Sequence, residues 1–225
     1  MDRLGRFKGL TTAVVLALGL CAVLDVVGLF SDVSYRHLLQ RAMAGASISI
    51  QQADSADHRQ AVIGWWQLGL FLATACFFLV WFRRAYTNVG RLGVHGLRYG
   101  PGWAVGAWFV PFLNFVRPKS IANDIWRGSD PTLAPEAAVE ISTSVPWYLN
   151  VWWAAFLISG IAGRIAFSSE RNAKTLSGLN SATTTLIWSD ALDLVAAIAA
   201  VAVVAAIFRR QQERASSTAM AEATA

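Results

Sequence analysis

The chain has 225 residues, of which 55% are hydrophobic and only 15% are charged. Soluble domains carry about a quarter of their residues charged, so this composition excludes an ordinary soluble domain, a nucleic-acid-binding module and a disordered chain. The net charge of +5 has another explanation, because membrane proteins concentrate Arg and Lys at the cytoplasmic ends of their helices. The sequence therefore predicts an all-α, polytopic helical membrane protein that forms a single membrane domain over residues 1–225.

Four apolar runs are each long enough to cross a bilayer, which requires about 20 predominantly apolar residues. We expect four transmembrane helices at residues 10–30, 61–82, 147–167 and 185–208. Residues 31–60 are expected to form an external loop, which includes one amphipathic helix. The tail at 211–225 is small and polar, and it is therefore expected to be disordered in the cytoplasm.

A fifth apolar run, the half-span at residues 103–116, has only 14 residues. That length suits a re-entrant or interfacial segment better than a crossing, and the sequence leaves these two alternatives open. Charge provides an independent test, because basic residues accumulate on the cytoplasmic side. Four spans and a cytoplasmic N-terminus place 13 of the 19 basic residues inside. A fifth crossing would place only 10 inside and 9 elsewhere. We therefore expect a multi-pass protein of the cell (inner or plasma) membrane with both termini in the cytoplasm.

The half-span lies within a distinctive block of sequence. The block reads PGWAVGAWFVPFLN at residues 101–114, and Arg117-Pro118 and Ile125-Trp126-Arg127 follow it. Upstream stands WFRRAY at 81–86, and downstream stands Trp152-Trp153. These residues resemble the domain of unknown function 4328, a family of bacterial membrane proteins that is common in actinobacteria. The resemblance covers roughly residues 64–207 and implies no catalytic residue, because the family has no assigned activity.

The half-span motif consists of Trp108, Pro111, Asn114, Pro118 and Trp126. In a helix, Pro111 would remove one backbone donor and leave a carbonyl without its partner. Within a membrane, broken helix is tolerated only against protein or a water-filled cavity. Asn114 would then satisfy a freed backbone group or contact a ligand. We favour a proline-kinked packing segment over a binding or conducting role.

Basic residues at the predicted inner side are candidates for contact with anionic headgroups, at about 1 kcal/mol for each residue near the surface. These residues are Arg83, Arg84, Arg91 and Arg98. The chain lacks a nucleotide-binding fingerprint and any nucleophile elbow or zinc-protease motif. We therefore expect no enzymatic activity, no metal and no cofactor.

Four ionisable residues lie within the predicted spans: Asp25, Arg164, Asp190 and Asp193. A rise of 1.5 Å per residue places all four in the outer third of the bilayer. Charges at this depth are rarely left unpaired, so we favour an ion-pair cluster. The alternative is that Arg164 extends to the headgroups while the acids face a shallow outer vestibule.

These observations favour a structural or regulatory membrane module that acts through lipids or protein partners. A membrane-protein partner or a second copy of the chain is compatible with this prediction, and nucleic acid is not. The alternative is a small transporter or channel with a cation or proton path at the buried charges. Transporters typically show two broken helices in corresponding halves. This chain offers only one, so the module is preferred.

Overall fold

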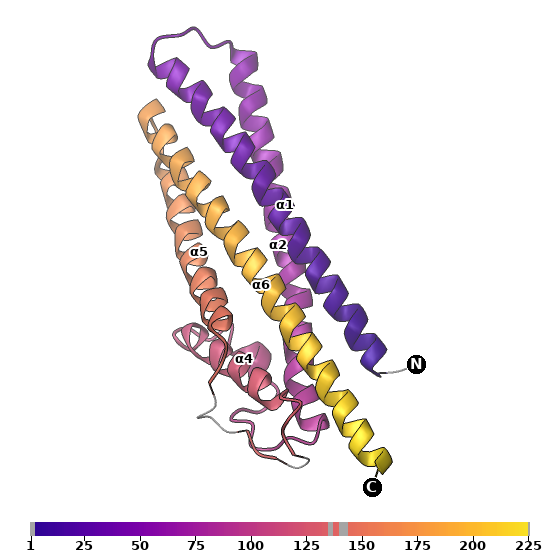
Figure 1. Cartoon of the computed structure of the whole chain (residues 1–225). Coiled ribbons are helices and arrows are strands. Elements are labelled where there is room, and N and C mark those ends of the chain that lie inside the picture. The colour runs from indigo at the N-terminus through magenta and orange to yellow at the C-terminus, as the bar shows by residue number, and fades with distance from the viewer. Residues whose placement is uncertain (1–2, 135–136, 140–143, 225) are drawn as a thin grey trace. The chain divides into compact units, whose positions relative to one another are not determined.

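The computed structural model describes residues 3–134, 137–139 and 144–224, and its regular structure is helical (Figure 1). Its elements are α1 (Arg3–Met43), α2 (Ile50–Arg91), α3 (Trp103–Gly106), η1 (Leu113–Phe115), α4 (Arg117–Gly128), α5 (Trp147–Asn172) and α6 (Leu176–Thr224). The described residues contain no strand, and an isolated β-bridge joins His95 to Ala138. The all-α prediction is therefore confirmed.

Helices α1, α2, α5 and α6 are long and apolar enough to cross a membrane. The shortest of them, α5, has 26 residues. At 1.5 Å per residue it is about 39 Å long, which exceeds the hydrocarbon thickness of about 30 Å. Each predicted span lies inside one of these helices, so the prediction of four span-length helices is confirmed.

The helices extend beyond the apolar runs that predict them. The connection between α1 and α2 is only residues 44–49, where the sequence predicts a loop over residues 31–60. Polar pairing between the two helices explains the difference. The Ser31 hydroxyl donates to Gln60 Oε1 at 3.0 Å, and the amide Nε2 of Gln60 donates to Asp32 Oδ1 at 2.7 Å. Polar side chains thus continue the helix contact beyond the apolar run.

Helix α6 continues to Thr224, in place of the disordered tail predicted for residues 211–225; residue 225 lies outside the described part. Two polar side chains within this stretch are buried. Gln211 donates from Nε2 to the backbone carbonyl of Ala85 at 2.8 Å. The guanidinium of Arg214, which is only 2% exposed, donates to the backbone carbonyls of Leu92, Asp130 and Leu133. These contacts order a segment whose composition alone indicates disorder.

The chain divides into two compact units. Unit 1 comprises Met1–Leu16, Thr74–Trp153 and Ala200–Ala225, and unit 2 comprises Ala17–Ala73 and Ala154–Ala199. Each long helix contributes one part to each unit. Unit 1 therefore contains the half-span, α4 and the C-terminal part of α6, whereas unit 2 contains all four intramembrane charges singled out from the sequence.

Candidate functional site

The half-span is a chain of short turns within unit 1. Helix α3 ends at Gly106, turns and a bend follow over residues 107–112, and the short η1 begins at Leu113. Phe112 has a φ of 64°, a left-handed conformation that is strained for a bulky side chain. The half-span is therefore broken over most of its length rather than kinked at Pro111 alone, and it is not one of the four span-length helices.

Trp108 anchors the half-span in the core of unit 1. Its ring packs edge-on against three aromatic rings, with centroid separations of 5.6, 5.7 and 5.9 Å, and these belong to Phe78, Phe82 and Trp153. The indole Nε1 of Trp153 also donates to the backbone carbonyl of Phe115 at 3.1 Å. The favoured packing role is thus consistent with the contacts of Trp108.

Other side chains of the half-span point outward. Phe109, Phe112 and Val116 are 70%, 83% and 65% exposed. Asn114 is partly buried, and its Oδ1 is buried without a hydrogen-bond donor among the described residues. The segment therefore combines an anchored aromatic side chain with an exposed apolar tip, which we define as Phe109, Phe112 and Val116.

Pro118 and Trp126 lie on α4, directly after the half-span. Pro118 is buried in the first turn of α4, where the missing proline N–H breaks no helical hydrogen bond. Trp126 stacks beneath the guanidinium of Arg210, whose Cζ is 4.4 Å from the ring centroid. Its backbone carbonyl accepts a hydrogen bond from Arg210 Nε at 3.1 Å. Trp126 therefore joins α4 to α6 within unit 1.

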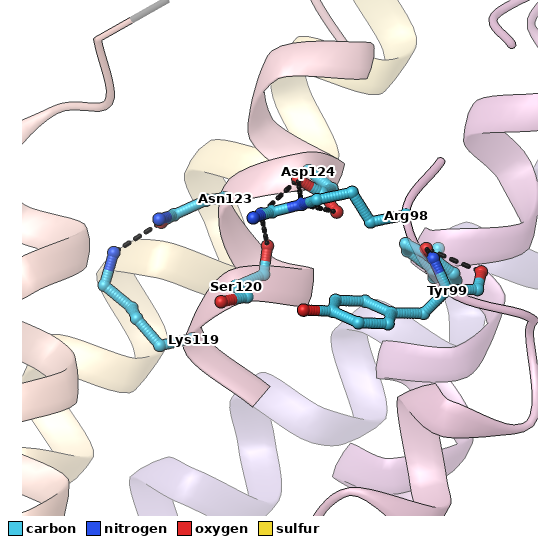
Figure 2. Close-up of polar contacts among 7 residues, drawn as sticks. Arg98, Tyr99, Lys119, Ser120, Asn123 and Asp124 are labelled. Carbon is cyan, nitrogen blue, oxygen red and sulfur yellow. Dashed lines mark hydrogen bonds and ion pairs between the residues drawn. The ribbon is translucent and has the colours of Figure 1, made fainter. Parts of the chain in front are cut away.

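Arg98 forms an ion pair with a buried carboxylate on α4 (Figure 2). Its Nε donates to both oxygens of Asp124 at 3.0 Å, and its Nη2 donates to Oδ1 at 2.6 Å. The side chain of Asp124 is fully buried and that of Arg98 is 27% exposed. The hydrogen bonds to Asp124 raise the pKa of Arg98. Arg98, expected to contact headgroups, is thus held by a protein carboxylate, a pairing that the sequence does not reveal.

The aromatic ring of Tyr99 lies near two guanidinium groups. The Cζ atoms of Arg98 and Arg117 are 5.7 and 5.0 Å from its centroid, and the Cζ of Arg117 is also 4.1 Å from the Trp103 centroid. The hydroxyl of Tyr86 donates to the Tyr99 carbonyl at 2.8 Å and accepts from its backbone N–H at 3.1 Å. These contacts fix the loop that carries Arg98 against α2.

Two more cations lie on α4. The ammonium of Lys119 donates to Asn123 Oδ1 (Figure 2). Burial lowers the pKa of Lys119 to about 8, and the charge of Arg127 lowers it as well. Burial also lowers the pKa of Arg127, while Asp124 raises it and Arg98 lowers it. We call Arg98, Arg117, Lys119 and Arg127 the α4 basic cluster.

The remaining predicted headgroup contacts are Arg83, Arg84 and Arg91, which are exposed on the C-terminal part of α2. Their role stays a prediction. The predicted headgroup contacts do not include the three cations of α4, which are Arg117, Lys119 and Arg127. The signal that could have found them is their position directly after an apolar segment that is too short to cross.

In unit 2, an amide joins two of the predicted intramembrane acids. Gln67 on α2 donates to Asp25 Oδ1 on α1 at 3.5 Å and to Asp190 Oδ1 on α6 at 3.3 Å. Asp193 accepts a hydrogen bond from Ser189 at 3.5 Å. Arg164 is exposed on α5, and no ion pair within the described residues links it to the three acids. The observed arrangement is therefore not the favoured ion-pair cluster, because a neutral amide takes the place expected for Arg164.

A cavity of about 100 Å³ adjoins Asp190 in unit 2. Its polar lining consists of Asp32, Gln60, Gln67, Glu170 and Asp190. At Gly28 a Cβ atom would lie 2.3 Å from Asp190 Oδ2, so the absence of a side chain there lets the carboxylate approach α1. The sequence singles out Asp190 but not the other polar lining residues, Asp32, Gln60, Gln67 and Glu170. Their spacing was the available signal, because Asp25 and Asp32, like Gln60 and Gln67, are two helical turns apart on one face.

Four span-length helices, without a strand in the described residues, define a polytopic helical membrane protein. The sequence model of the family described as "Domain of unknown function (DUF4328)" matches residues 44–209, which is nearly three-quarters of the chain. The chain belongs to this family, and the resemblance noted around the half-span is confirmed. No curated protein and no solved structure matches the chain.

Proposed function

We propose that this protein is a structural or regulatory module of the cell membrane that acts through lipids. The supporting observation is the exposed apolar tip, in a segment too short to cross and directly before the basic helix α4. Transfer of each such side chain from water into lipid contributes about 1.5–3 kcal/mol. Interfacial segments combine an apolar face with basic residues in this way, and they lie at the boundary between headgroups and acyl chains.

The positive-inside rule supports an orientation with unit 1 at the cytoplasmic face. Unit 1 carries the α4 basic cluster, the basic C-terminal end of α2 and the basic residues of both terminal segments. In this orientation both termini are cytoplasmic, and the apolar tip enters the inner leaflet. A membrane-protein partner or a second copy would use the same module. Lipid is the preferred partner because apolar and basic side chains adjoin.

The proposal is tested by measuring the depth of Phe112 in a bilayer. A cysteine-free variant carrying Phe112→Cys receives a fluorescent label and is reconstituted with nitroxide-labelled lipids. The control is Ser217→Cys, at an exposed position on the C-terminal part of α6. We expect the nitroxides to quench the label at residue 112 strongly and the label at 217 weakly. Equal, weak quenching at both positions would show that the tip does not enter the bilayer.

Orientation is tested with fusions of a periplasm-active enzyme. Fusions after Gln51 or Ser177 should be active, and fusions after Asp130 or Arg210 should be inactive. Activity after Asp130 would mean that residues 103–116 cross the membrane, and the proposed topology would then be wrong.

The second candidate function is a small transporter or channel for cations or protons. The supporting observation is the cavity of unit 2, whose lining includes the carboxylates of Asp32, Glu170 and Asp190. Proteoliposomes that enclose a pH-sensitive dye measure proton movement directly. Transport requires a flux that Asp190→Asn abolishes and that Asp54→Asn, at an exposed position on α2, leaves intact. Absence of any flux above that of protein-free liposomes, for protons and for monovalent cations, would eliminate this candidate.

A further inference from the structure

The cavity of unit 2 is lined by residues of four helices. Residues four positions apart share one face of a helix, and three such pairs line the cavity. These pairs are Gly28 and Asp32 on α1, Gln60 and Gly64 on α2, and Leu186 and Asp190 on α6, while Glu170 lies on α5. The helical repeat therefore turns one face of α1, of α2 and of α6 toward the same space.

Contacts between side chains hold two carboxylates at this cavity. A Cβ atom at Gly28 would lie 2.3 Å from Asp190 Oδ2 and 2.9 Å from Gln67 Nε2, so both of these side chains reach α1 there. The amide of Gln67 donates to Asp190 Oδ1 at 3.3 Å. One helical turn further along α1, Gln60 Nε2 donates to Asp32 Oδ1 at 2.7 Å. The carboxylates of Asp32 and Asp190 are thus placed at neighbouring turns of α1 and border the same cavity.

The carboxylate of Asp32 lacks a cation among the described residues. Asp32 is only 5% exposed, and its hydrogen bond comes from the neutral amide of Gln60. Its other oxygen, Oδ2, accepts no hydrogen bond from the described residues. Arg59 donates from Nε to the hydroxyl of Ser31 instead of to an acid, and no described residue in the lining is basic. Because a buried carboxylate is rarely left without a cation, the cavity presents negative charge to its occupant.

The lining suits an ammonium ion better than a metal ion. No group of three His, Cys, Asp or Glu side chains in the described part of the chain could hold a metal, whereas Ca²⁺ requires about six to eight oxygen ligands. An ammonium group binds separate oxygens through its N–H donors. Ile63 and Leu186 add an apolar wall that matches a short alkyl chain. A volume of about 100 Å³ has room for a few water molecules, so the ligand is small.

We infer that the cavity of unit 2 binds a short primary ammonium ion, with the carboxylates of Asp32 and Asp190 as its acceptors. Gln67 is a positioning residue, because its amide holds Asp190. The carbonyl oxygen of Gln67 accepts no hydrogen bond from the described residues and provides a third acceptor. The inference deepens the second candidate function, since it names the cation; it rests on the same cavity but requires no transport.

The position of the cavity leaves two sources for the ammonium group. Asp32 lies just after the apolar run at 10–30, and Gln60 directly precedes the run at 61–82. The cavity therefore adjoins the end of the spans, where lipid headgroups and dissolved ions are both present. The ligand is either a free amine or the headgroup of an ethanolamine lipid.

Binding is measured on the full chain in nanodiscs of phosphatidylcholine, with methylammonium as the probe. A ligand of so few atoms is expected to bind with a Kd of about 1 mM or weaker, a range in which saturation-transfer difference NMR detects the methyl signal. Empty nanodiscs provide the background. We expect a saturable signal that ethylammonium displaces and that tetramethylammonium, which is larger and has no N–H donor, does not displace. Absence of a saturable signal, or equal displacement by tetramethylammonium, would overturn the inference.

A matched pair of glycine variants locates the ligand. At Gly64 and at Gly69 no atom lies within 4 Å of an added Cβ, but only Gly64 lines the cavity. Gly64→Leu should fill the cavity and abolish the methylammonium signal, whereas Gly69→Leu should retain it. Leucine is also the better helix former, and an unchanged thermal unfolding midpoint shows that each variant is folded. A signal that survives Gly64→Leu would place methylammonium elsewhere and overturn the inference.

A second pair of variants tests the charge. Asp190→Asn removes a charged acceptor and should weaken methylammonium binding by about tenfold or more. Asp54→Asn, at an exposed position on α2, should leave binding unchanged. Equal binding by the two variants would show that the carboxylate of Asp190 is not an acceptor and would overturn the inference.

Lipid composition separates the two sources. The measurement is repeated in nanodiscs that also contain phosphatidylethanolamine. A weaker methylammonium signal there identifies the headgroup as the competing ligand, and an unchanged signal identifies a free amine; both support the ammonium site. Binding without any cation flux in proteoliposomes would end only the transport candidate. A proton flux without methylammonium binding would overturn the inference and leave that candidate standing.

Discussion

Arg98→Ala is expected to destabilise unit 1 strongly, because it leaves the carboxylate of Asp124 buried without its cation. The carboxylate is fully buried, and all three of its hydrogen bonds from Arg98 would be lost. Removal of one partner from a buried ion pair costs about 3–5 kcal/mol. Because the Arg98 side chain is 27% exposed, water reaches the site, and we expect the lower end, about 3 kcal/mol. That cost lowers the ratio of folded to unfolded protein by about two orders of magnitude.

The measurement is reversible unfolding in mixed micelles, followed by circular dichroism. Arg91→Ala is the matched control, because Arg91 is exposed at the end of α2 and surface changes usually stay within about 0.5 kcal/mol. The double variant Arg98→Ala/Asp124→Asn should recover part of the loss, since it removes the uncompensated charge. The ion-pair argument is wrong if Arg98→Ala lowers the free energy of unfolding no more than Arg91→Ala does. It is also wrong if the double variant loses the sum of the two single losses.

Three further changes test other parts of the structure. Gly28→Ala should lower stability by about 1–3 kcal/mol through overpacking, because the new Cβ would lie 2.3 Å from Asp190 Oδ2. Gly69→Ala is the control, because the space around its Cβ is open, and it should show no such loss in the same unfolding assay. Arg214→Gln should lower stability by about 1–3 kcal/mol, because the backbone carbonyls of Asp130 and Leu92 lose their donors. The variant should also be cleaved faster by protease near the C-terminus. An unchanged rate of cleavage would contradict these contacts. The pKa of Lys119 is about 8 when folded, against an ordinary value of 10.5, so the unfolded chain binds more protons between these values and stability should rise with pH across that window. Lys119→Gln should flatten that rise in pH-dependent unfolding, and an identical slope in both proteins would refute it.

The arrangement of the spans could be predicted because a bilayer imposes a length. A run of about 20 apolar residues has few alternatives to a spanning helix, and each predicted run lies within one of the four long helices. The half-span was recognised by the same criterion, since 14 residues are too few. Its turns could not be predicted, because the sequence indicates a break at Pro111 alone, whereas the strained position is Phe112.

Polar contacts could not be predicted, because they join residues far apart in the sequence. Gln67 pairs with Asp25 and Asp190, which are 42 and 123 residues away. Charge alone pairs the acids with Arg164, since opposite signs share one depth, and it gives no reason to expect a neutral amide as the donor. The order of the C-terminal tail could not be predicted for a similar reason. Its helix is ordered by the contacts of Gln211 and Arg214 with chain segments about 80 or more residues earlier.

The two units differ in the sign of the charge that they retain, and this difference favours a lipid-facing role for unit 1. In unit 2, Asp25 and Asp190 share the donor Gln67, and no cation is among their described partners. A neutral amide therefore joins these two acids. In unit 1 basic residues outnumber acidic ones, and α4, which carries Arg117 and Lys119, directly follows the segment of the exposed apolar tip. Burying a surplus of cations is unfavourable unless an anion compensates. An anionic leaflet offers about 1 kcal/mol for each basic residue near it, while the tip gains from leaving water. Both terms act at the same segment and in the same direction, and they support our proposal that the apolar tip and the basic residues of α4 contact lipid together.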